Sequence, residues 1–462
     1  MNERPRGHIS DSRFHGHMYA TEASRAIFCD TCRLQRWLDV EAALAASQAD
    51  VGTLPRETAE EICRAASVER LDLDEIAREV KRTGHSLMAL IVALQHACEG
   101  DAGQFVHYGA TTQDIQDTAQ ALEMRDCLDE AERLLVDIAR SLVPLGREHA
   151  TTMMTGRTHA QPALPITFGL KVASWLDELL RAYERLQQVR ATALMVQLFG
   201  GVGSMAAFGD SAEALLARFA ERLGLGVPGM GWHASRDRVT DYVNAMAMLA
   251  ATTARIADEI RTLSRPELAE LVPGWQYGKI GSSTMPHKRN PEECEQIVVL
   301  ARLAAAQAPI ALQAMVVEHE RDSRELRTEW ASVADVSHYS LTALSILDDV
   351  LASLAVDEAA MTANATATAA DLATEQLMLR LVSHLGKQSA YEVVYEAAQA
   401  AKSNGRSIRD ELLLAEGNSL TAEEIDATLD PAGYVGLAPE IARKAIERAD
   451  AWLAAREAPV AR

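Results

Sequence analysis

The sequence is short of cysteine and of positive charge, and both shortages limit what the protein can do. Its 462 residues include six cysteines, which are scattered and too few for a disulfide framework. A formal net charge of −21 argues against nucleic acid or an anionic membrane as the main partner. The same charge repels anionic ligands at long range, so a site for an anionic substrate needs cations of its own.

Long apolar runs are also missing. No stretch approaches the roughly 20 apolar residues of a membrane span, and the N-terminus, MNERPRGHIS, lacks the apolar core of a signal peptide. A cytoplasmic protein is therefore expected. With 48% hydrophobic and 24% charged residues the composition is that of an ordinary globular chain, and its length suggests about three domains.

Three short motifs suggest chemistry that their context does not support. Cys29 and Cys32 have the spacing of a thioredoxin motif or half a zinc site, but no second pair accompanies them, which favours packed helical thiols. Residues 200–203 are glycine-rich but lack the Gly-Lys-Ser/Thr ending of a phosphate-binding loop, which favours a turn between helices. His15 and His17 suit a solvated or capping role better than metal ligation. The sequence offers no metal-ligand constellation and no cofactor-binding pattern.

Helical periodicity dominates the sequence, and runs of alternating β-branched residues are absent, so the predicted fold class is all-α. Apolar residues recur at three- and four-residue steps, for example over 128–145 and 172–186. Such stripes are typical of long helices packed side by side in a bundle. In the middle of the chain they are expected to break at Pro144 and at the glycine runs. The predicted domains are 1–112, N-terminal and helical; 113–355, a central long-helix bundle; and 356–462, C-terminal with shorter helices.

Four polar islands interrupt the helical patterns, and each combines small residues with hydroxyls and a titratable group. They are 83–86 (Thr-Gly-His-Ser), 107–114 (His-Tyr-Gly-Ala-Thr-Thr-Gln-Asp), 155–162 (Thr-Gly-Arg-Thr-His-Ala-Gln-Pro) and 281–291 (Gly-Ser-Ser-Thr-Met-Pro-His-Lys-Arg-Asn-Pro). A lone histidine in such a place would more often be structural. Four groups of this kind are typical of an anion-binding site, so we predict that the islands carry the chemistry.

The fourth island has the most unusual composition. Its two prolines forbid a regular helix, its small residues allow a ligand to approach closely, and Lys288 and Asn290 supply a charge and an amide that can hold a carboxylate. The string 281–291 resembles GSSxMPxKxNP, the most specific motif of the fumarase/aspartase superfamily. With His287 and Arg289 it is similar to the branch of adenylosuccinate lyase and 3-carboxy-cis,cis-muconate cycloisomerase.

The resemblance implies roles for residues in every island. It selects Ser282 as the catalytic base, and a serine could act so only as an alkoxide stabilised by backbone N–H groups and Lys288 in a closed pocket. It implies His159 as the general acid or its relay, with Glu295 as the acidic partner that orients the imidazole. His85 is a second candidate acid. The substrate-binding residues it implies are His85, His107, Thr111, Thr112, Gln113, Thr158, Lys288, Asn290 and Arg321.

The implied reaction is β-elimination from a substituted succinate. A proton next to a carboxylate is removed, and the resulting carbanion, stabilised by that carboxylate, expels a β-substituent. Superfamily members are homotetramers built on a central helical bundle, with sites that draw on three subunits. We therefore expect a homotetramer, a small anionic dicarboxylate as substrate, no metal or other cofactor, and activity that chelators leave unchanged.

The sequence leaves the substrate open. Leu326 and Trp330 stand where the nucleotide lyases place a serine and an arginine on the phosphate, which argues against adenylosuccinate itself. Ser235 stands where relatives usually carry glutamine, and the run ALPITFG at 163–169 resembles the cycloisomerases. The favoured hypothesis is cleavage of a C–N bond with release of fumarate. The alternatives are 3-carboxy-cis,cis-muconate cycloisomerisation and a non-catalytic structural protein on the same scaffold.

Overall fold

The computed structural model describes residues 8–457 and divides the chain into two compact units. The first unit comprises the residues up to 135, 181–255 and 296–346, and the second comprises 136–180, 256–295 and the residues from 347 onward. The helical fold class predicted from the sequence is confirmed. Five helices belong partly to each unit: α6 (Thr112–Glu148), α7 (Phe168–Ala193), α9 (Asp237–Leu263), α10 (Glu292–Ala305) and α12 (Ser323–Ala352). The three-domain division by sequence position stays a prediction.

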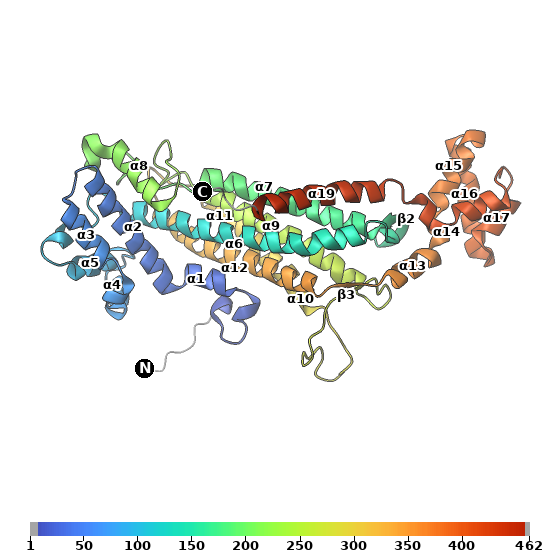
Figure 1. The fold of residues 1–462 in the computed structure, drawn as a ribbon, viewed down its shortest axis with the longest axis horizontal. Coiled ribbons are helices and arrows are strands. Elements are labelled where there is room, and N and C mark those ends of the chain that lie inside the picture. The colour runs from blue at the N-terminus through green and yellow to red at the C-terminus, as the bar shows by residue number, and fades with distance from the viewer. Residues whose placement is uncertain (1–7, 458–462) are drawn as a thin grey trace. The chain divides into compact units, whose positions relative to one another are not determined.

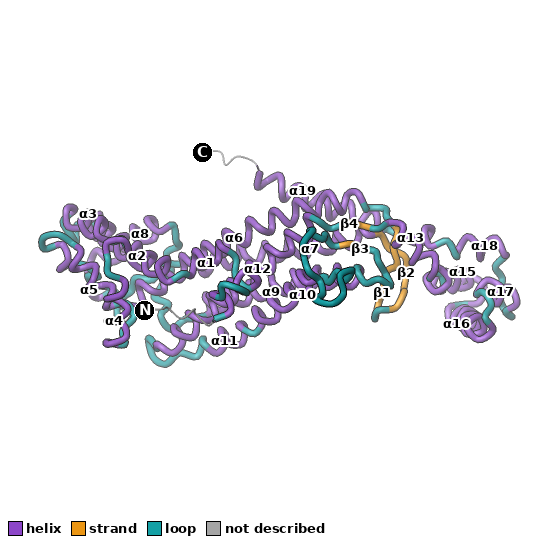
Figure 2. Tube along the Cα trace, turned by 90° about the horizontal axis from the view of Figure 1, so that it is seen from below, coloured by secondary structure: helices purple, strands orange, loops and turns teal. Residues whose placement is uncertain are grey.

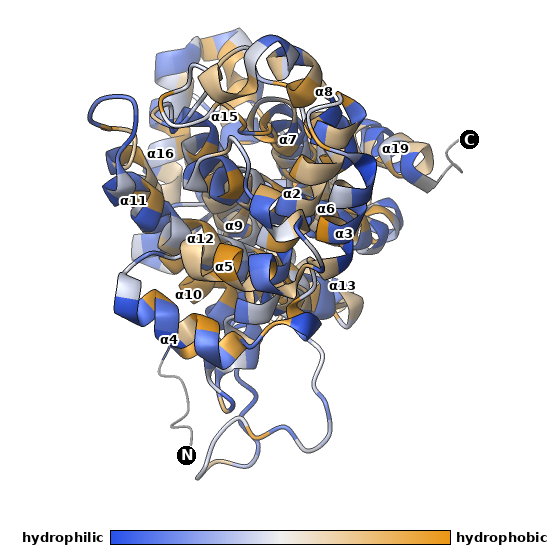
Figure 3. Cartoon of the chain, turned by 90° about the vertical axis from the view of Figure 1, so that its left-hand side faces the viewer, coloured by the Kyte–Doolittle hydropathy of each residue, from blue (hydrophilic) through white to orange (hydrophobic). Residues whose placement is uncertain are grey.

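Other helices complete the first unit. They are η1 (Ile9–Asp11), η2 (Gly16–Met18), α1 (Glu22–Phe28), α2 (Asp30–Asp50), α3 (Arg56–Ala65), η3 (Val68–Arg70), α4 (Leu73–Thr83), α5 (Met88–Ala97), η4 (Ala102–Phe105), η5 (Ala206–Ser211), α8 (Ala212–Leu223) and α11 (Gln307–Gln313). Helix α4 is amphipathic, with hydrophilic and hydrophobic residues around it (Figure 3). Asp72 caps its start by accepting from the Glu75 N–H at 2.9 Å, and Gly84 ends it with a φ of 70°.

The second unit adds four short strands and a group of C-terminal helices. These elements are β1 (Met153–Thr158), β2 (Gln161–Thr167), β3 (Leu271–Val272), β4 (Ala355–Val356), α13 (Glu358–Ala367), α14 (Ala369–Leu372), α15 (Thr374–Leu385), α16 (Lys387–Asn404), α17 (Ile408–Leu414), α18 (Ala422–Thr428), η6 (Pro431–Tyr434) and α19 (Ala438–Glu457). Helices α15, α16 and α17 lie together (Figure 1) around a small core that includes Leu377, Leu381, Leu412 and Ile425.

The third polar island lies on a β-hairpin, which the sequence analysis did not predict. Strands β1 and β2 pair antiparallel from Met153 and Thr167 down to Thr158 and Gln161 (Figure 2). Two prolines in β2 hide the strand pattern. A two-stranded sheet tolerates them because each strand has a free edge where no N–H is needed. The small sheet does not change the fold class, but it gives the third island a rigid support.

The expected break at Pro144 is wrong. Helix α6 continues through Pro144 to Glu148. A proline removes one backbone hydrogen bond and crowds the preceding turn, and here it lies only four residues before the helix ends. The loss is therefore confined to the last turns of a helix of 37 residues, which the rest of its packing sustains.

The prediction that Cys29 and Cys32 are packed thiols is also wrong. Cys29 is the N-cap residue of α2, outside the regular helix, and it forms a disulfide with Cys32 in the first turn. Their Cα atoms lie 5.1 Å apart, which is within the usual range for a disulfide. The spacing itself explains the contact, because an N-cap side chain reaches the residue three positions later.

One segment, Glu292–Gln313, differs from the expectation that no apolar stretch is long enough to span a membrane. Helices α10 and α11, over Glu292–Gln313, are together long and apolar enough to pass a length and composition test for a membrane span. The two helices are separated by a turn at Ala306. Length and composition are weak evidence for a single helix of this kind, because core helices of globular proteins pass the same test.

Candidate active site

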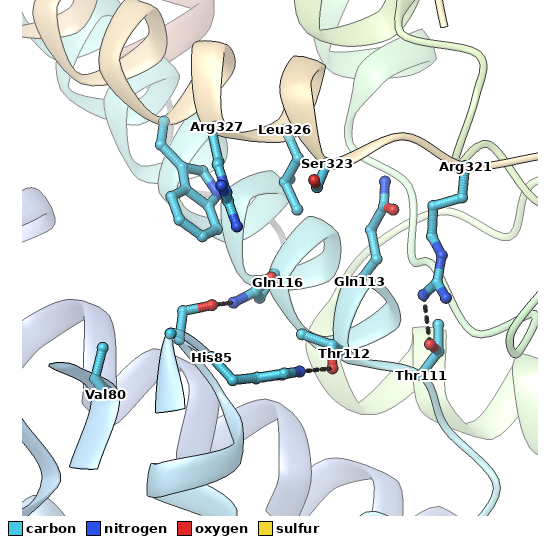
Figure 4. Close-up of a pocket in the computed structure, with 13 residues that line it drawn as sticks. Val80, His85, Thr111, Thr112, Gln113, Gln116, Arg321, Ser323, Leu326 and Arg327 are labelled. Carbon is cyan, nitrogen blue, oxygen red and sulfur yellow. Dashed lines mark hydrogen bonds between the residues drawn. The ribbon is translucent and has the colours of Figure 1, made fainter. Parts of the chain in front are cut away.

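A pocket of about 580 Å³ in the first unit brings five of the predicted substrate-binding residues together (Figure 4). These are His85, Thr111, Thr112, Gln113 and Arg321. Figure 4 shows Ser323, Leu326 and Arg327 on one side and His85, Thr111 and Thr112 on the other. The remaining lining residues are Val80, Gly84, Ser86, Gln116 and Trp330. The first and second islands therefore share one pocket with the beginning of α12.

Asp114 fixes the start of α6 at this pocket. Its buried carboxylate accepts hydrogen bonds from the N–H groups of Thr111, Phe199 and Gly200, at 3.0, 3.0 and 2.9 Å. It also lies 2.9 Å from Nε2 of His233. The glycine run after α7 is thus a turn that binds an aspartate of the same chain, in agreement with the sequence analysis. Because Asp114 holds the backbone, Thr111 and Thr112 are presented at a helix N-terminus, where anions are favoured.

Polar side chains in the pocket are linked in pairs. Nη1 of Arg321 donates to Oγ1 of Thr111 at 2.6 Å, and Nε2 of Gln116 donates to Oγ of Ser86 at 2.8 Å (Figure 4). Nε2 of His85 lies 3.5 Å from Oγ1 of Thr112. These links hold donors in fixed positions around a space that suits carboxylates.

The ring of His85 has a defined orientation. The Met88 N–H donates to its Nδ1 at 3.1 Å, so Nδ1 is an acceptor and the proton of the neutral ring is on Nε2. That proton faces Thr112 and the pocket. The role of His85, as an acid or as a substrate ligand, stays a prediction.

A buried ionic network of Asp117, Arg236 and Glu329 is joined to the pocket through Gln113. The Gln113 amide donates to Asp117 and to the carbonyl of His233, at 3.0 and 3.1 Å. Arg236, 1% exposed, pairs with Asp117 at 2.9 Å and with Glu329. Burial opposes its charge, but the two carboxylates outweigh burial and raise the pKa of Arg236. Burial raises the pKa of Glu329, against the opposing effect of Arg236. The network fixes α6, α9 and α12 beneath the substrate-binding residues.

His107 stands apart from the pocket. It has a φ of 63°, and its Nδ1 lies 2.6 Å from Oε1 of Glu41, so its nearest partner is structural. Burial lowers the pKa of His107, but the hydrogen bond and charge of Glu41 outweigh burial and raise it above the ordinary value. A contact between His107 and substrate remains a prediction.

The fourth island is an exposed loop of the second unit that joins β3 to α10. Ser282 Oγ accepts hydrogen bonds from the N–H groups of Thr284 and Met285, at 3.3 and 3.0 Å. Two backbone donors of this kind are one of the features that a serine alkoxide needs. The side chain of Lys288 is exposed on the same loop. We call residues 273–291 the serine loop.

The base of the serine loop is narrow. A Cβ on Gly281 would lie 2.2 Å from the carbonyl oxygen of Lys288, so only glycine fits there. The Asn290 amide donates to the Gly281 carbonyl at 2.6 Å. Asn290 is predicted to hold substrate, and its amide also has a partner within the loop; the contact with substrate stays a prediction.

His159 and Thr158 lie at the exposed tip of the β1–β2 hairpin. His159 and Ala160 have φ values of 52° and 61°, as both central residues of a two-residue type I′ turn require. Neither is glycine, and such strain tends to persist where function needs it. Arg157 anchors the hairpin through an ion pair of 2.6 Å to the fully buried Glu270.

Glu295 lies in the first turn of α10 and is exposed. The structure shows no hydrogen bond between Glu295 and His159 within residues 8–457 of the single chain. Both residues are exposed, and a pairing between them stays a prediction.

Sequence reasoning missed several residues of the pocket. Arg327 and Ser323 are the most informative of them. With Leu326 and Trp330 they occupy positions i, i+3, i+4 and i+7 of one helical face, and all four line the pocket. The spacing of these four residues is visible in the sequence, but helical periodicity alone does not show that this face lines a pocket.

Comparison with known proteins places the whole chain. The profile described as "Lyase" matches residues 16–306, and that described as "Adenylosuccinate lyase C-terminus" matches 372–445. The chain belongs to the fumarase/aspartase superfamily of lyases. It is therefore an enzyme, and the alternative of a structural protein is set aside.

Two superfamily members similar to this lyase have different named substrates. The "N-acetyl-S-(2-succino)cysteine lyase" of Dickeya dadantii is 38% identical over 96% of this chain and 98% of its own length. The "Adenylosuccinate lyase" of Methanothermobacter thermautotrophicus is 35% identical over 94% of this chain and 98% of its own. Among solved structures, the 3-carboxy-cis,cis-muconate lactonizing enzyme of Pseudomonas putida matches with a TM-score of 0.85 and 32% identity, covering 94% of this chain and 98% of that one.

Proposed function

We propose that this lyase cleaves the C–S bond of a 2-succino thioether by β-elimination and releases fumarate and a thiol. The observation that carries the proposal is the similarity, over nearly the whole chain, to a lyase named for an S-(2-succino)cysteine derivative. The pocket supports it, because hydroxyls, an amide and Arg321 surround a space suited to carboxylates. The C–N bond favoured by the sequence analysis and the muconate reaction become the competing outcomes of the test.

The proposed reaction balances without a co-reactant. A base removes a proton from the CH₂ group next to one carboxylate, and the electron pair is delocalised onto that carboxylate. The pair then forms the C=C bond of fumarate as the C–S bond breaks, and its electrons leave with sulfur. The thiolate takes a proton from an acid. Donors that bind the carboxylate more tightly as its charge grows lower the barrier.

Ser282 is the proposed base. Two backbone N–H groups already donate to its Oγ, at 3.3 and 3.0 Å, so an alkoxide there would keep both bonds and gain strength from them. Lys288 on the same exposed loop supplies a cation that could approach when the loop closes on substrate. Closure would exclude water, which a serine base requires.

His159, with Glu295, is the proposed proton donor to the leaving group. Each is exposed and lacks the other as a partner in its own chain, which supports a site completed by other subunits of a homotetramer. Mixing and reassembling the inactive Ser282→Ala and His159→Gln variants should then restore part of the activity, since some hybrid sites carry both residues. A mixture that stays inactive while forming hybrid tetramers would contradict shared sites.

The substrate is tested by following fumarate absorbance with a panel of compounds. The panel holds S-(2-succino)cysteine, its N-acetyl form, adenylosuccinate and a nitrogen-linked succinate of similar size, beside 3-carboxymuconate lactonisation. We expect the thioethers to have the highest kcat/KM. Release of fumarate only from nitrogen compounds, or lactone conversion alone, would overturn the C–S assignment. Activity in the presence of EDTA should be unchanged, and a cytoplasmic location belongs to the same proposal.

A further inference from the structure

Arg327 is a cation of the pocket that is not needed to bind the succinate half of the substrate. Arg321 is already linked to Thr111 at 2.6 Å, beside the hydroxyls proposed to hold the succinate carboxylates. Arg327 lies farther along the pocket wall, one turn after Ser323 on α12. Figure 4 shows its side chain extending from α12 on the same side as Leu326 and Ser323.

The lining of the pocket that holds Arg327 has no opposite charge among the described residues, since it includes no aspartate or glutamate. Arg324, three positions earlier, pairs with Asp322 and Glu318 instead, while Arg327 makes no ion pair within residues 8–457. In a chain whose net charge is −21, an unpaired exposed arginine in a pocket is a local attraction for an anionic group.

The wall around Arg327 is apolar. Leu326, 7% exposed, and Trp330 lie on the same face of α12 as Arg327, and Val80 of α4 lines the same pocket. Trp330 is held by a ring contact with Trp37, at 6.5 Å between centroids. This part of the pocket therefore joins one cation to a firm hydrophobic surface.

We propose that Arg327 binds the carboxylate of the leaving group and that Val80, Leu326 and Trp330 contact an acyl substituent on its nitrogen. The proposal rests on the proposed C–S lyase function and names the class of thiol that leaves: an N-acylated amino acid. A free α-ammonium group would lie near Arg327 in a pocket that has no acidic side chain in its lining. Repulsion between the two positive charges and the loss of water from the ammonium group would both weaken its binding. Acylation removes that charge and adds apolar surface.

The experiment measures kcat/KM for fumarate release in a two-by-two design. The substrates are N-acetyl-S-(2-succino)cysteine and the succinated N-acetylcysteamine, which lacks only the leaving-group carboxylate. The enzymes are the wild type and Arg327→Gln. Removing the carboxylate should lower kcat/KM about 10- to 100-fold in the wild type, the usual worth of a charged hydrogen-bonded pair. In Arg327→Gln the two substrates should be equal, because the partner of the carboxylate is gone.

Arg324→Gln is the matched control, since it removes a neighbouring arginine that is paired outside the pocket. It should keep the wild-type ratio between the two substrates. Product inhibition gives a second measurement independent of chemistry. N-acetylcysteine should compete with substrate, and its inhibition constant should rise about tenfold in Arg327→Gln, whereas inorganic phosphate should not compete in either enzyme.

The outcomes separate the two proposals. A wild type that releases no fumarate from either thioether overturns the proposed function and this assignment together. Thioether cleavage with the same substrate ratio in wild type and Arg327→Gln overturns the role of Arg327 alone. Equal kcat/KM for S-(2-succino)cysteine and its N-acetyl form overturns the acyl contact.

Discussion

The side-chain amide of Asn290 donates to the carbonyl oxygen of Gly281 at 2.6 Å and closes the base of the serine loop. The contact requires glycine at 281, because the Lys288 carbonyl lies where a Cβ would be. Residues 281 and 290 of the loop are therefore tied together, while residues 283–289 between them are exposed. Ser282, next to this tie, is half-buried, unlike residues 283–289.

Ser282→Ala should lower kcat by about 10³-fold, because general base catalysis typically contributes 10²- to 10⁴-fold. Substrate binding should change little, since the carboxylate donors of the pocket remain. Ser283→Ala is the control, because its hydroxyl is exposed on the same loop and no catalytic role is assigned to it. Steady-state fumarate release measures both. Near-normal turnover in Ser282→Ala would rule out its role as base.

His159→Gln should slow nitrogen-linked succinates more than thioethers. A thiol has a pKa of about 8.5, so a thiolate leaves without full protonation, whereas an amine does not. We expect a loss in kcat of about 10-fold for the thioether and 100-fold or more for any nitrogen substrate the wild type accepts. Equal losses for both would mean that His159 does not protonate the leaving group.

Arg236→Gln should destabilise the folded state by about 3–5 kcal/mol, because it leaves Asp117 and Glu329 buried without their shared cation. Chemical denaturation followed by circular dichroism measures the change. Arg238→Gln, two residues away and only half-buried, removes a donor to the Thr192 carbonyl and should alter stability by only about 1 kcal/mol. A small effect of Arg236→Gln would show that the carboxylates accept protons or water at little cost.

The acid side of the stability profile should depend on His338. Burial lowers the pKa of His338 to about 4, whereas the unfolded chain binds this proton with a pKa of about 6.5. Between these values the unfolded state holds more protons, so stability falls as pH drops from 6.5 towards 4, by up to roughly 3 kcal/mol. His338→Gln should flatten that slope in urea unfolding series. An unchanged slope would show that His338 is not the group responsible.

Much of the fold could be predicted from the sequence, because apolar residues at three- and four-residue steps indicate amphipathic helices. The β1–β2 hairpin was not, since Pro162 and Pro165 mask a strand that pairs on one edge only. At Pro144 the sequence predicted a helix break that the structure does not have. One backbone hydrogen bond lost near a helix end costs less free energy than the packing of the helix contributes.

The site was predicted unevenly. Short motifs located Thr111, Thr112 and Ser282, because close backbone approach and hydroxyl donors need a compact string of small residues. Arg327 was not predicted as a site residue. Its proposed role depends on the helical face that it shares with Leu326 and Trp330, and only the folded chain shows that this face lines a pocket with Val80. The bond from the Asn290 amide to the Gly281 carbonyl was not foreseen, because a sequence motif does not reveal internal hydrogen bonds. A contact between Asn290 and substrate stays a prediction.

Protease cleavage in the exposed serine loop should depend on whether substrate is bound. Lys288 and Arg289 are both exposed on the loop and are cleavage points for trypsin. If the loop closes over substrate, cleavage there should slow, and mass spectrometry of the fragments would show it. Ser282→Ala keeps both basic residues, so it should still be protected by a substrate that it cannot turn over. Ligand binding can thus be followed by proteolysis in variants that have no activity to measure.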